Sequence, residues 1–146
     1  NLIVDVDGYY PISSTFHPLV PGRLIDSRVP ASTTVDGQFQ GIGIRTAGST
    51  TELQITGRGQ LPNYATTVVL NVTVTGALSA GYVTVYPCGG TQPPNTSNLN
   101  FNDDETIANL VISSVGEGGK VCIFTSAATH IIADVNGYYD GYAVSP

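Results

Sequence analysis

The sequence predicts an all-β protein, a β-sandwich of about 9–11 strands with jelly-roll or immunoglobulin-like Greek-key connections and no significant helix. Apolar and polar residues alternate at period two through most of the chain, and no window holds the 3.6-residue pattern of an amphipathic helix. Clusters of Gly, Pro and Asn interrupt these runs at intervals of mostly about 8–15 residues, as turns between strands do. At 146 residues the chain fits one domain that buries its own core.

Segments with strand character follow one another along the whole chain. In order, they are residues 2–10, 22–27, 33–39, 51–56, 66–75, 81–86, 97–101, 108–115, 120–125 and 129–139. In segment 66–75 the even positions are all apolar, so we expect this face of the strand to lie in the core. Residues 131–135 are apolar at both parities except at Asp134, which predicts a central strand buried on both faces.

One short sequence occurs near both ends of the chain, 129 positions apart (131 minus 2). Its first occurrence, residues 2–10 and here called the N-terminal copy, is Leu2, Ile3, Val4, Asp5, Val6, Asp7, Gly8, Tyr9 and Tyr10. Its second occurrence is Ile131, Ile132, Ala133, Asp134, Val135, Asn136, Gly137, Tyr138 and Tyr139. Every matched pair is identical or chemically close, which indicates duplication of a longer unit. We interpret the chain as one period of a tandem array, preceded by the last strand of the previous unit.

This interpretation divides the chain into four parts. Residues 1–10 are a candidate donor strand, 11–21 a linker, 22–139 the β-sandwich module and 140–146 a C-terminal linker. The linker is predicted because the prolines of segment 11–21 are poorly suited to a sheet ladder. The chain contains no methionine, so we expect it to be part of a longer precursor.

The charge excludes some classes of partner. The formal net charge is −6, and Lys and Arg together number only 5. Without a basic stripe to displace counterions, binding to nucleic acid is not expected. Membrane insertion is not expected either, because no apolar run approaches the roughly 18 residues that a membrane-spanning helix needs.

Two cysteines, Cys88 and Cys122, follow strand-like runs. A disulfide between them would close a loop of about 35 residues and stabilise the fold by roughly 3–4 kcal/mol. The alternative is two buried free thiols. The scarcity of Lys and Glu and the abundance of Thr suggest an extracellular protein and therefore favour the disulfide.

Several motifs in a fixed order resemble a known kind of repeat module. They are Arg23-Leu24-Ile25-Asp26-Ser27-Arg28, Val69-Leu70-Asn71-Val72-Thr73, Val83-Thr84-Val85-Tyr86-Pro87-Cys88-Gly89, Ser97-Asn98-Leu99-Asn100-Phe101, Ile107-Ala108-Asn109, Gly119-Lys120-Val121-Cys122 and Asp134-Val135-Asn136-Gly137-Tyr138. Together they resemble a tandem-repeat β module of large secreted and cell-surface bacterial proteins, especially of actinobacteria-like lineages, generally of unassigned function. The resemblance implies an exported module with a Cys88–Cys122 bridge and no activity. It also implies structural roles for Asn71, Asn98, Asn100 and Asn109.

The charged residues offer weak candidate sites. Asp5, Asp7, Asp103 and Asp104 are candidate calcium ligands, but the ligand series of a calcium loop is incomplete, and we favour turn-capping or solvated carboxylates instead. Arg23, Asp26 and Arg28 form either a structural Arg–Asp pair or an anionic-ligand site. Period two places Arg23 on the face opposite Asp26 and Arg28, so we expect no single network of the three.

No catalytic motif is present. The two histidines, His17 and His130, are too few for a metal site, and no strained nucleophile turn accompanies them. We therefore expect neither enzyme activity nor a cofactor.

Tyrosines and sequons suggest contacts with carbohydrate. Tyr64, Tyr82 and Tyr142 are candidate sugar-stacking residues, although core and interface packing accounts for many tyrosines. Asn95 and Asn71 begin sequons and are candidate glycosylation sites, Asn95 in a Pro-rich loop and Asn71 within a strand.

The function that these observations favour is structural. We expect a subunit of an extracellular repeat array or filament, with copies of itself as partners, assembled through strand exchange or linker-joined modules. The alternative is an accessory module of a secreted protein that binds carbohydrate or cell wall.

Overall fold

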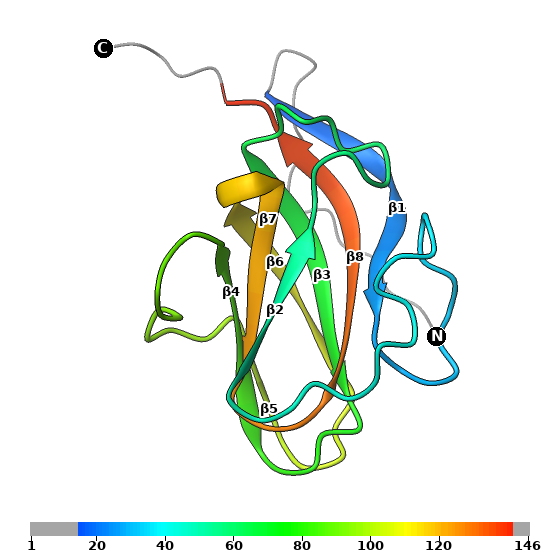
Figure 1. Ribbon diagram of the computed structural model, residues 1–146, viewed down its shortest axis with the longest axis vertical. Helices are drawn as coiled ribbons and strands as arrows, with labels where there is room; N and C mark the ends of the chain where they lie inside the picture. The colour runs from blue at the N-terminus through cyan, green and yellow to red at the C-terminus, as the bar shows by residue number, and fades with distance from the viewer. Residues whose placement is uncertain (1–14, 142–146) are drawn as a thin grey trace, which may run out of the picture.

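The computed structural model describes residues 15–141, which form two four-stranded antiparallel sheets packed face to face (Figure 1). The elements are β1 (Phe16–Asp26), β2 (Ser49–Gln54), β3 (Thr67–Thr75), β4 (Gly81–Pro87), β5 (Leu99–Phe101), β6 (Ile107–Ser114), the 3-10 turn η1 (Glu117–Gly119), β7 (Lys120–Thr125) and β8 (His130–Tyr139). The predicted all-β class is confirmed. Within residues 15–141 the helical content is η1 alone.

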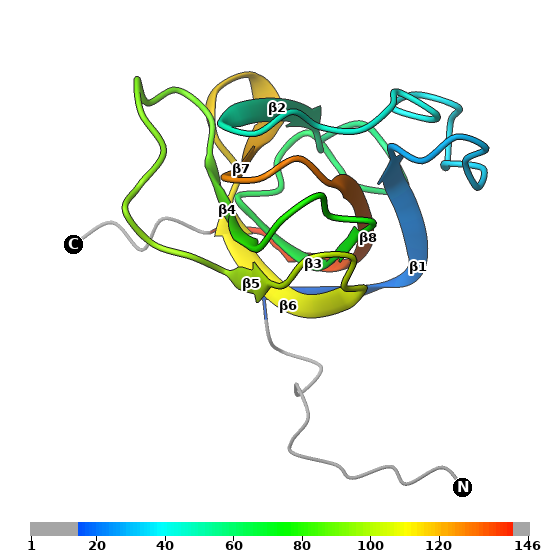
Figure 2. The ribbon, with the colours of Figure 1, turned by 90° about the horizontal axis from the view of Figure 1, so that it is seen from below.

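The strand order is that of a jelly roll. One sheet has the order β1-β8-β3-β6 and the other β2-β7-β4-β5. The first strand therefore pairs with the eighth, the second with the seventh, the third with the sixth and the fourth with the fifth, as in one long hairpin rolled up on itself. Figure 2 shows the two sheets curling around the core. Of the two predicted topologies, the structure has the jelly roll rather than the immunoglobulin arrangement.

The core forms where the alternation of the sequence predicts it. Val68, Leu70, Val72 and Val74 are fully buried on the inner face of β3. The predicted central strand is also confirmed, because β8 lies between β1 and β3 and residues 131–133 and 135 are all buried.

The predicted linker is wrong over residues 16–21, which belong to β1. β1 is an edge strand with β8 as its one neighbour in the sheet. A proline in it, which has no backbone N–H, therefore leaves no second strand without a hydrogen-bond donor. The pairing with β8 also shifts register between Pro18 and Gly22, and such a bulge accommodates Pro21 without a ladder hydrogen bond. The module therefore begins at least six positions before residue 22, at Phe16.

The predicted strand at residues 33–39 is also wrong, because this segment is a loop along the outer edge of β1. Gly37 and Phe39 have φ of 74° and 54°, which interrupts an extended chain. The loop is held by Arg58, only 4% exposed, whose guanidinium lies 2.7 Å from Asp36 Oδ2 and donates to Gln38 O. Its backbone is paired with β1 through Val35 N, which donates to Arg23 O.

The two ends of the described chain lie at the same end of the sandwich, uppermost in Figure 1. Phe16 at the start of β1 pairs with Tyr139 at the end of β8, and Asp140 N donates to Thr15 O. Tyr64 is nearby, with its ring centroid 6.4 Å from that of Tyr138. We call this end, with Phe16, Tyr64, Tyr138 and Tyr139, the terminal pole.

Candidate assembly site

The position of β8 between β1 and β3, here called the β8 slot, receives the second copy of the duplicated sequence. β8 is antiparallel to both neighbours, pairing along its length with β1 from Phe16 to Asp26 and with β3 from Thr67 to Thr75. On the inner face Ile131, Ala133 and Val135 are 0% exposed. Without β8 the inner edges of β1 and β3 would lose their ladder partners and the core would open to water.

Three side-chain contacts fix β8 in register. Asp134 accepts two hydrogen bonds from Arg23, Nε to Oδ1 at 2.8 Å and one terminal nitrogen to Oδ2 at 3.2 Å. Gly137 lies directly under the ring of Phe16, since a Cβ at this position would be 2.6 Å from a ring carbon. The rings of Tyr138 and His17 are stacked, with centroids 4.7 Å apart.

The N-terminal copy, which lies outside the described residues, keeps the residues that make these contacts. It has Asp5 where β8 has Asp134, Gly8 for Gly137 and Tyr9 for Tyr138. The copies differ at the matched pairs Leu2 and Ile131, Val4 and Ala133, and Asp7 and Asn136. Its sequence therefore meets the polar and steric requirements of the β8 slot, with one excess of volume at Val4.

The slot also contains two residues that the sequence alone assigns to the linker. Phe16 and His17 both contact β8. Phe16 is paired with Tyr139 and lies diagonally over Gly137, and such an aromatic–glycine contact becomes visible only once the β1–β8 register is known.

Arg23, Asp26 and Arg28 do form one network, contrary to the expectation from period two. Asp26, fully buried, accepts from Arg28 at 2.7 Å and from Arg23 at 3.2 Å, while Arg23 also binds Asp134. The reason is a register shift between Arg23 and Ile25, which turns Leu24 and Ile25 both inward. Hydrogen bonds from Arg28 are the main cause of the lowered pKa of Asp26, about 2. Because carboxylates already engage both guanidiniums, the network favours a structural role over binding of an anion.

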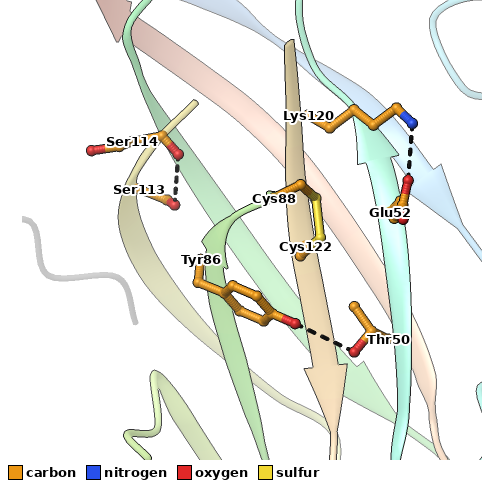
Figure 3. Close-up of a disulfide and its surroundings, with 8 residues drawn as sticks. All are labelled: Thr50, Glu52, Tyr86, Cys88, Ser113, Ser114, Lys120 and Cys122. Atoms are coloured by element: carbon orange, nitrogen blue, oxygen red, sulfur yellow. Dashed lines mark hydrogen bonds and ion pairs between the residues drawn. A yellow bond between two sulfur atoms is a disulfide. The ribbon is translucent and has the colours of Figure 1, made fainter. Parts of the chain in front are cut away.

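The predicted disulfide between Cys88 and Cys122 is confirmed (Figure 3). It joins the residue after β4 to the middle of β7, across a sequence separation of 34. Beside it, Lys120 Nζ lies 2.9 Å from Glu52 Oε2, and the Tyr86 hydroxyl lies 3.4 Å from Thr50 Oγ1 (Figure 3). The first contact joins β7 to β2, and the second joins β4 to β2 across the intervening β7. Disulfides are typical of proteins in oxidising compartments.

The candidate sugar contacts do not form one platform. Tyr64 is 66% exposed at the terminal pole, Tyr82 is the second residue of β4 in the other sheet, and Tyr142 lies outside the described residues. A polar groove of about 290 Å³ instead brings Tyr82 together with Asn95, Thr96, Ser97 and Asn100. The Tyr82 ring is supported by Phe124, with centroids 5.9 Å apart. Asn95 is exposed, whereas Asn71 lies within β3, paired to strands on both sides.

The amide side chains of two resemblance motifs connect loops to strands. Asn98 Oδ1 accepts from Val85 N at 2.7 Å, and Asn109 donates from its amide nitrogen to Asn98 O at 2.6 Å. Both contacts fit the structural roles that the resemblance implies for these residues.

The candidate calcium ligands and the histidine His130 are not gathered into a metal site in the described residues. Asp103 and Asp104 are exposed in the turn between β5 and β6, and Asp5 and Asp7 lie outside the described residues. His130 Nδ1 lies 3.2 Å from Ser27 Oγ, which in turn accepts from Ile131 N. Within residues 15–141, no three or more His, Cys, Asp or Glu residues are grouped as a metal site would require. This part of the chain also contains no helix with the length and apolar character needed to cross a membrane.

Comparison with known proteins gave no further assignment. No family model matches the chain, and no curated protein matches it. The resemblance to a secreted bacterial repeat module therefore stays a prediction from the motifs.

Proposed function

We propose that the chain is a structural subunit of an extracellular repeat array or filament, without enzyme activity, whose modules are joined by short linkers or by exchange of a strand. The observation that supports this most directly is that the N-terminal copy preserves Asp, Gly and Tyr at the positions that fix β8 in its slot. Each module has one such slot, and this chain carries two sequences for it. The additional one suits the slot of a neighbour.

Location outside the cell is part of the proposal. The disulfide supports it, because such bonds persist in secreted and cell-surface proteins. The resemblance to a tandem-repeat module of secreted bacterial proteins supports it independently.

The short connection constrains how two such modules are placed. From Tyr10 to Phe16 the chain advances six residues, which reach at most about 22 Å. β8 is ten residues long and thus spans about 33 Å. A neighbour whose slot holds the N-terminal copy therefore lies with its terminal pole beside this one, not at the far end of the sandwich. Neighbouring modules are expected to meet pole to pole.

Assembly of the purified chain tests the proposal. Deletion of residues 1–10 is expected to abolish polymers while the folded module remains, because residues 15–141 include a complete jelly roll. Size-exclusion chromatography with light scattering and negative-stain electron microscopy measure this. Gly8→Val is a sharper variant, since its side chain would clash with a Phe16 ring in any β8-type slot. Ser13→Val is the matched control. The proposal is contradicted if the intact chain forms nothing but monomers, or if the Gly8→Val variant assembles normally.

The polar groove supports a second candidate, an accessory module that binds polysaccharide. A tyrosine ring with amide and hydroxyl groups beside it is suited to stacking on a sugar ring and bonding its hydroxyls. A glycan array followed by Tyr82→Ala tests this, with Tyr64→Ala as the control, because Tyr64 is exposed but outside the groove. Equal loss in both variants, or no ligand, contradicts the candidate.

A further inference from the structure

The β8 slot has two candidate occupants in one chain. We infer that the N-terminal copy can replace β8 within its own molecule, closing a hairpin with β1 and leaving residues 130–139 as the strand offered to a neighbour. The inference rests on the proposed function and deepens it, because it makes either end of the chain a donor for the slot of a second copy.

The direction of the chain permits this replacement. β8 runs toward the terminal pole and ends at Tyr139, opposite Phe16 where β1 begins. The N-terminal copy immediately precedes β1, so a strand ending at Tyr10 in the place of Tyr139 is antiparallel to β1, as β8 is. The first and last strands of the jelly roll are neighbours, and a segment joined to the start of β1 therefore enters the slot from the correct end.

The connection is also long enough. Paired residues of an antiparallel ladder lie about 5 Å apart, and residues 11–15 would have to join Tyr10 to Phe16 across that gap. Hairpin loops of four or five residues are common. Pro11 would take the place of Asp140, so the bond that Asp140 N donates to Thr15 O and the 3.0 Å contact of Asp140 Oδ2 with His17 Nε2 would be lost.

The side chains fit at the fixing contacts and differ at two buried positions, of which Leu2 in place of Ile131 keeps the same volume. Asp5 would face Arg23, and Gly8 would leave room for the ring of Phe16. Val4 would replace Ala133, which is 0% exposed, so the copy brings extra volume into a filled core. β8 is therefore the preferred occupant and the N-terminal copy the second one.

Replacement within one molecule is favoured over replacement between molecules when β8 is removed. A short connection gives the tethered strand an effective concentration in the millimolar range, far above the micromolar concentration of a protein sample. A chain that lacks β8 is consequently expected to close on itself and remain a monomer.

The test is a chain of residues 1–129, which lacks β8 and keeps the N-terminal copy. We expect a folded monomer with the Cys88–Cys122 disulfide and a cooperative thermal transition, measured by circular dichroism, mass spectrometry and light scattering over a hundredfold range of concentration. Failure to fold, or folding only as oligomers, overturns the inference. A chain of residues 15–129, with neither strand, is expected to be unfolded, and the same stability there would also overturn it.

Point variants of the 1–129 chain test the fit of the strand. Gly8→Val is expected to abolish the cooperative transition, and Ser13→Val, in the connecting loop, to leave it unchanged. Val4→Ala is expected to raise the melting temperature, because it restores the residue that β8 has. An unchanged transition in Gly8→Val would show that the slot is filled by something else and would contradict the inference.

The outcome is separable from that of the proposed function. If the 1–129 chain folds as a monomer and the intact chain never assembles, the slot accepts the copy and the filament proposal fails. If the intact chain assembles and the 1–129 chain does not fold, strands do not interchange within one molecule and the filament proposal stands.

Discussion

At the scale of single residues, Arg58 is the buried cation on which the loop beside β1 depends. Besides its pair with Asp36 it donates to Leu24 O at 2.9 Å and to Gln54 O at 3.0 Å, so its removal leaves carbonyl groups without partners. We expect Arg58→Met to lower the free energy of unfolding by about 3 kcal/mol or more. Urea denaturation measures this, with Arg45→Met as control, since the described bonds of the Arg45 side chain are to two carbonyls of its own loop. Equal losses in the two variants would contradict the role of Arg58.

The carboxylates of Asp26 and Asp36 make the free energy of unfolding depend on pH in the acidic range. Hydrogen bonds from Arg28 to Asp26 and from Arg58 to Asp36 lower both pKa values from 3.8 to about 2. Such groups stabilise the fold above the pKa of the unfolded chain, by roughly 2 kcal/mol for the buried Asp26 and by less for the exposed Asp36, whose pair with Arg58 is screened by solvent. This contribution is lost as pH falls through the folded value. We therefore expect the free energy of unfolding to decrease between about pH 4 and pH 2. Chemical denaturation across this range measures it, and a flat profile would contradict the two pairs. Asp36→Asn should remove its share of the slope.

At the scale of elements, the sequence was sufficient wherever local alternation decided the structure. β7 has the predicted bounds, and the inner face of β3 consists of the predicted valines and leucine. The sequence was insufficient where pairing with a neighbouring strand determines the structure. Prolines are tolerated in β1 because β1 is an edge strand, and the bulge that brings Arg23 and Asp26 to one face is defined only by pairing with β8. A local pattern contains no information about either neighbour.

Part of the candidate site could also be predicted from the sequence, and part could not. The duplicated sequence draws attention to β8, and composition together with the resemblance favours the disulfide, which the structure contains. The groove that joins Tyr82 to Asn95 could not be predicted, because the two belong to a strand and a loop separated along the chain. Arg58 was hidden for a related reason. It lies between two glycines in a sequence typical of an exposed turn, while its partners Asp36 and Leu24 are 22 and 34 positions away.

At the scale of the whole molecule, the nesting of the jelly roll brings the first and last strands together and both ends of the described residues 15–141 to one pole. A pull on these ends acts on the β1–β8 pair from Phe16 and Tyr139 inward, so its hydrogen bonds are loaded one after another. An array tensioned through its linkers would therefore open its modules by unzipping.

Single-molecule force spectroscopy measures this anisotropy directly. With handles at Thr15 and Gly141 the β1–β8 pair is unzipped, whereas with handles at Thr15 and Ala128, which lies just before β8 at the opposite end of the sandwich, the same pair is sheared. Shearing loads all bonds of the pair together, so we expect a higher mean unfolding force for Thr15 and Ala128 at the same pulling speed. The fold, the disulfide and the strand pair are identical in both experiments, and the two differ only in the direction of load. An equal or greater force for Thr15 and Gly141 would show that β1 and β8 are not the first strands to separate.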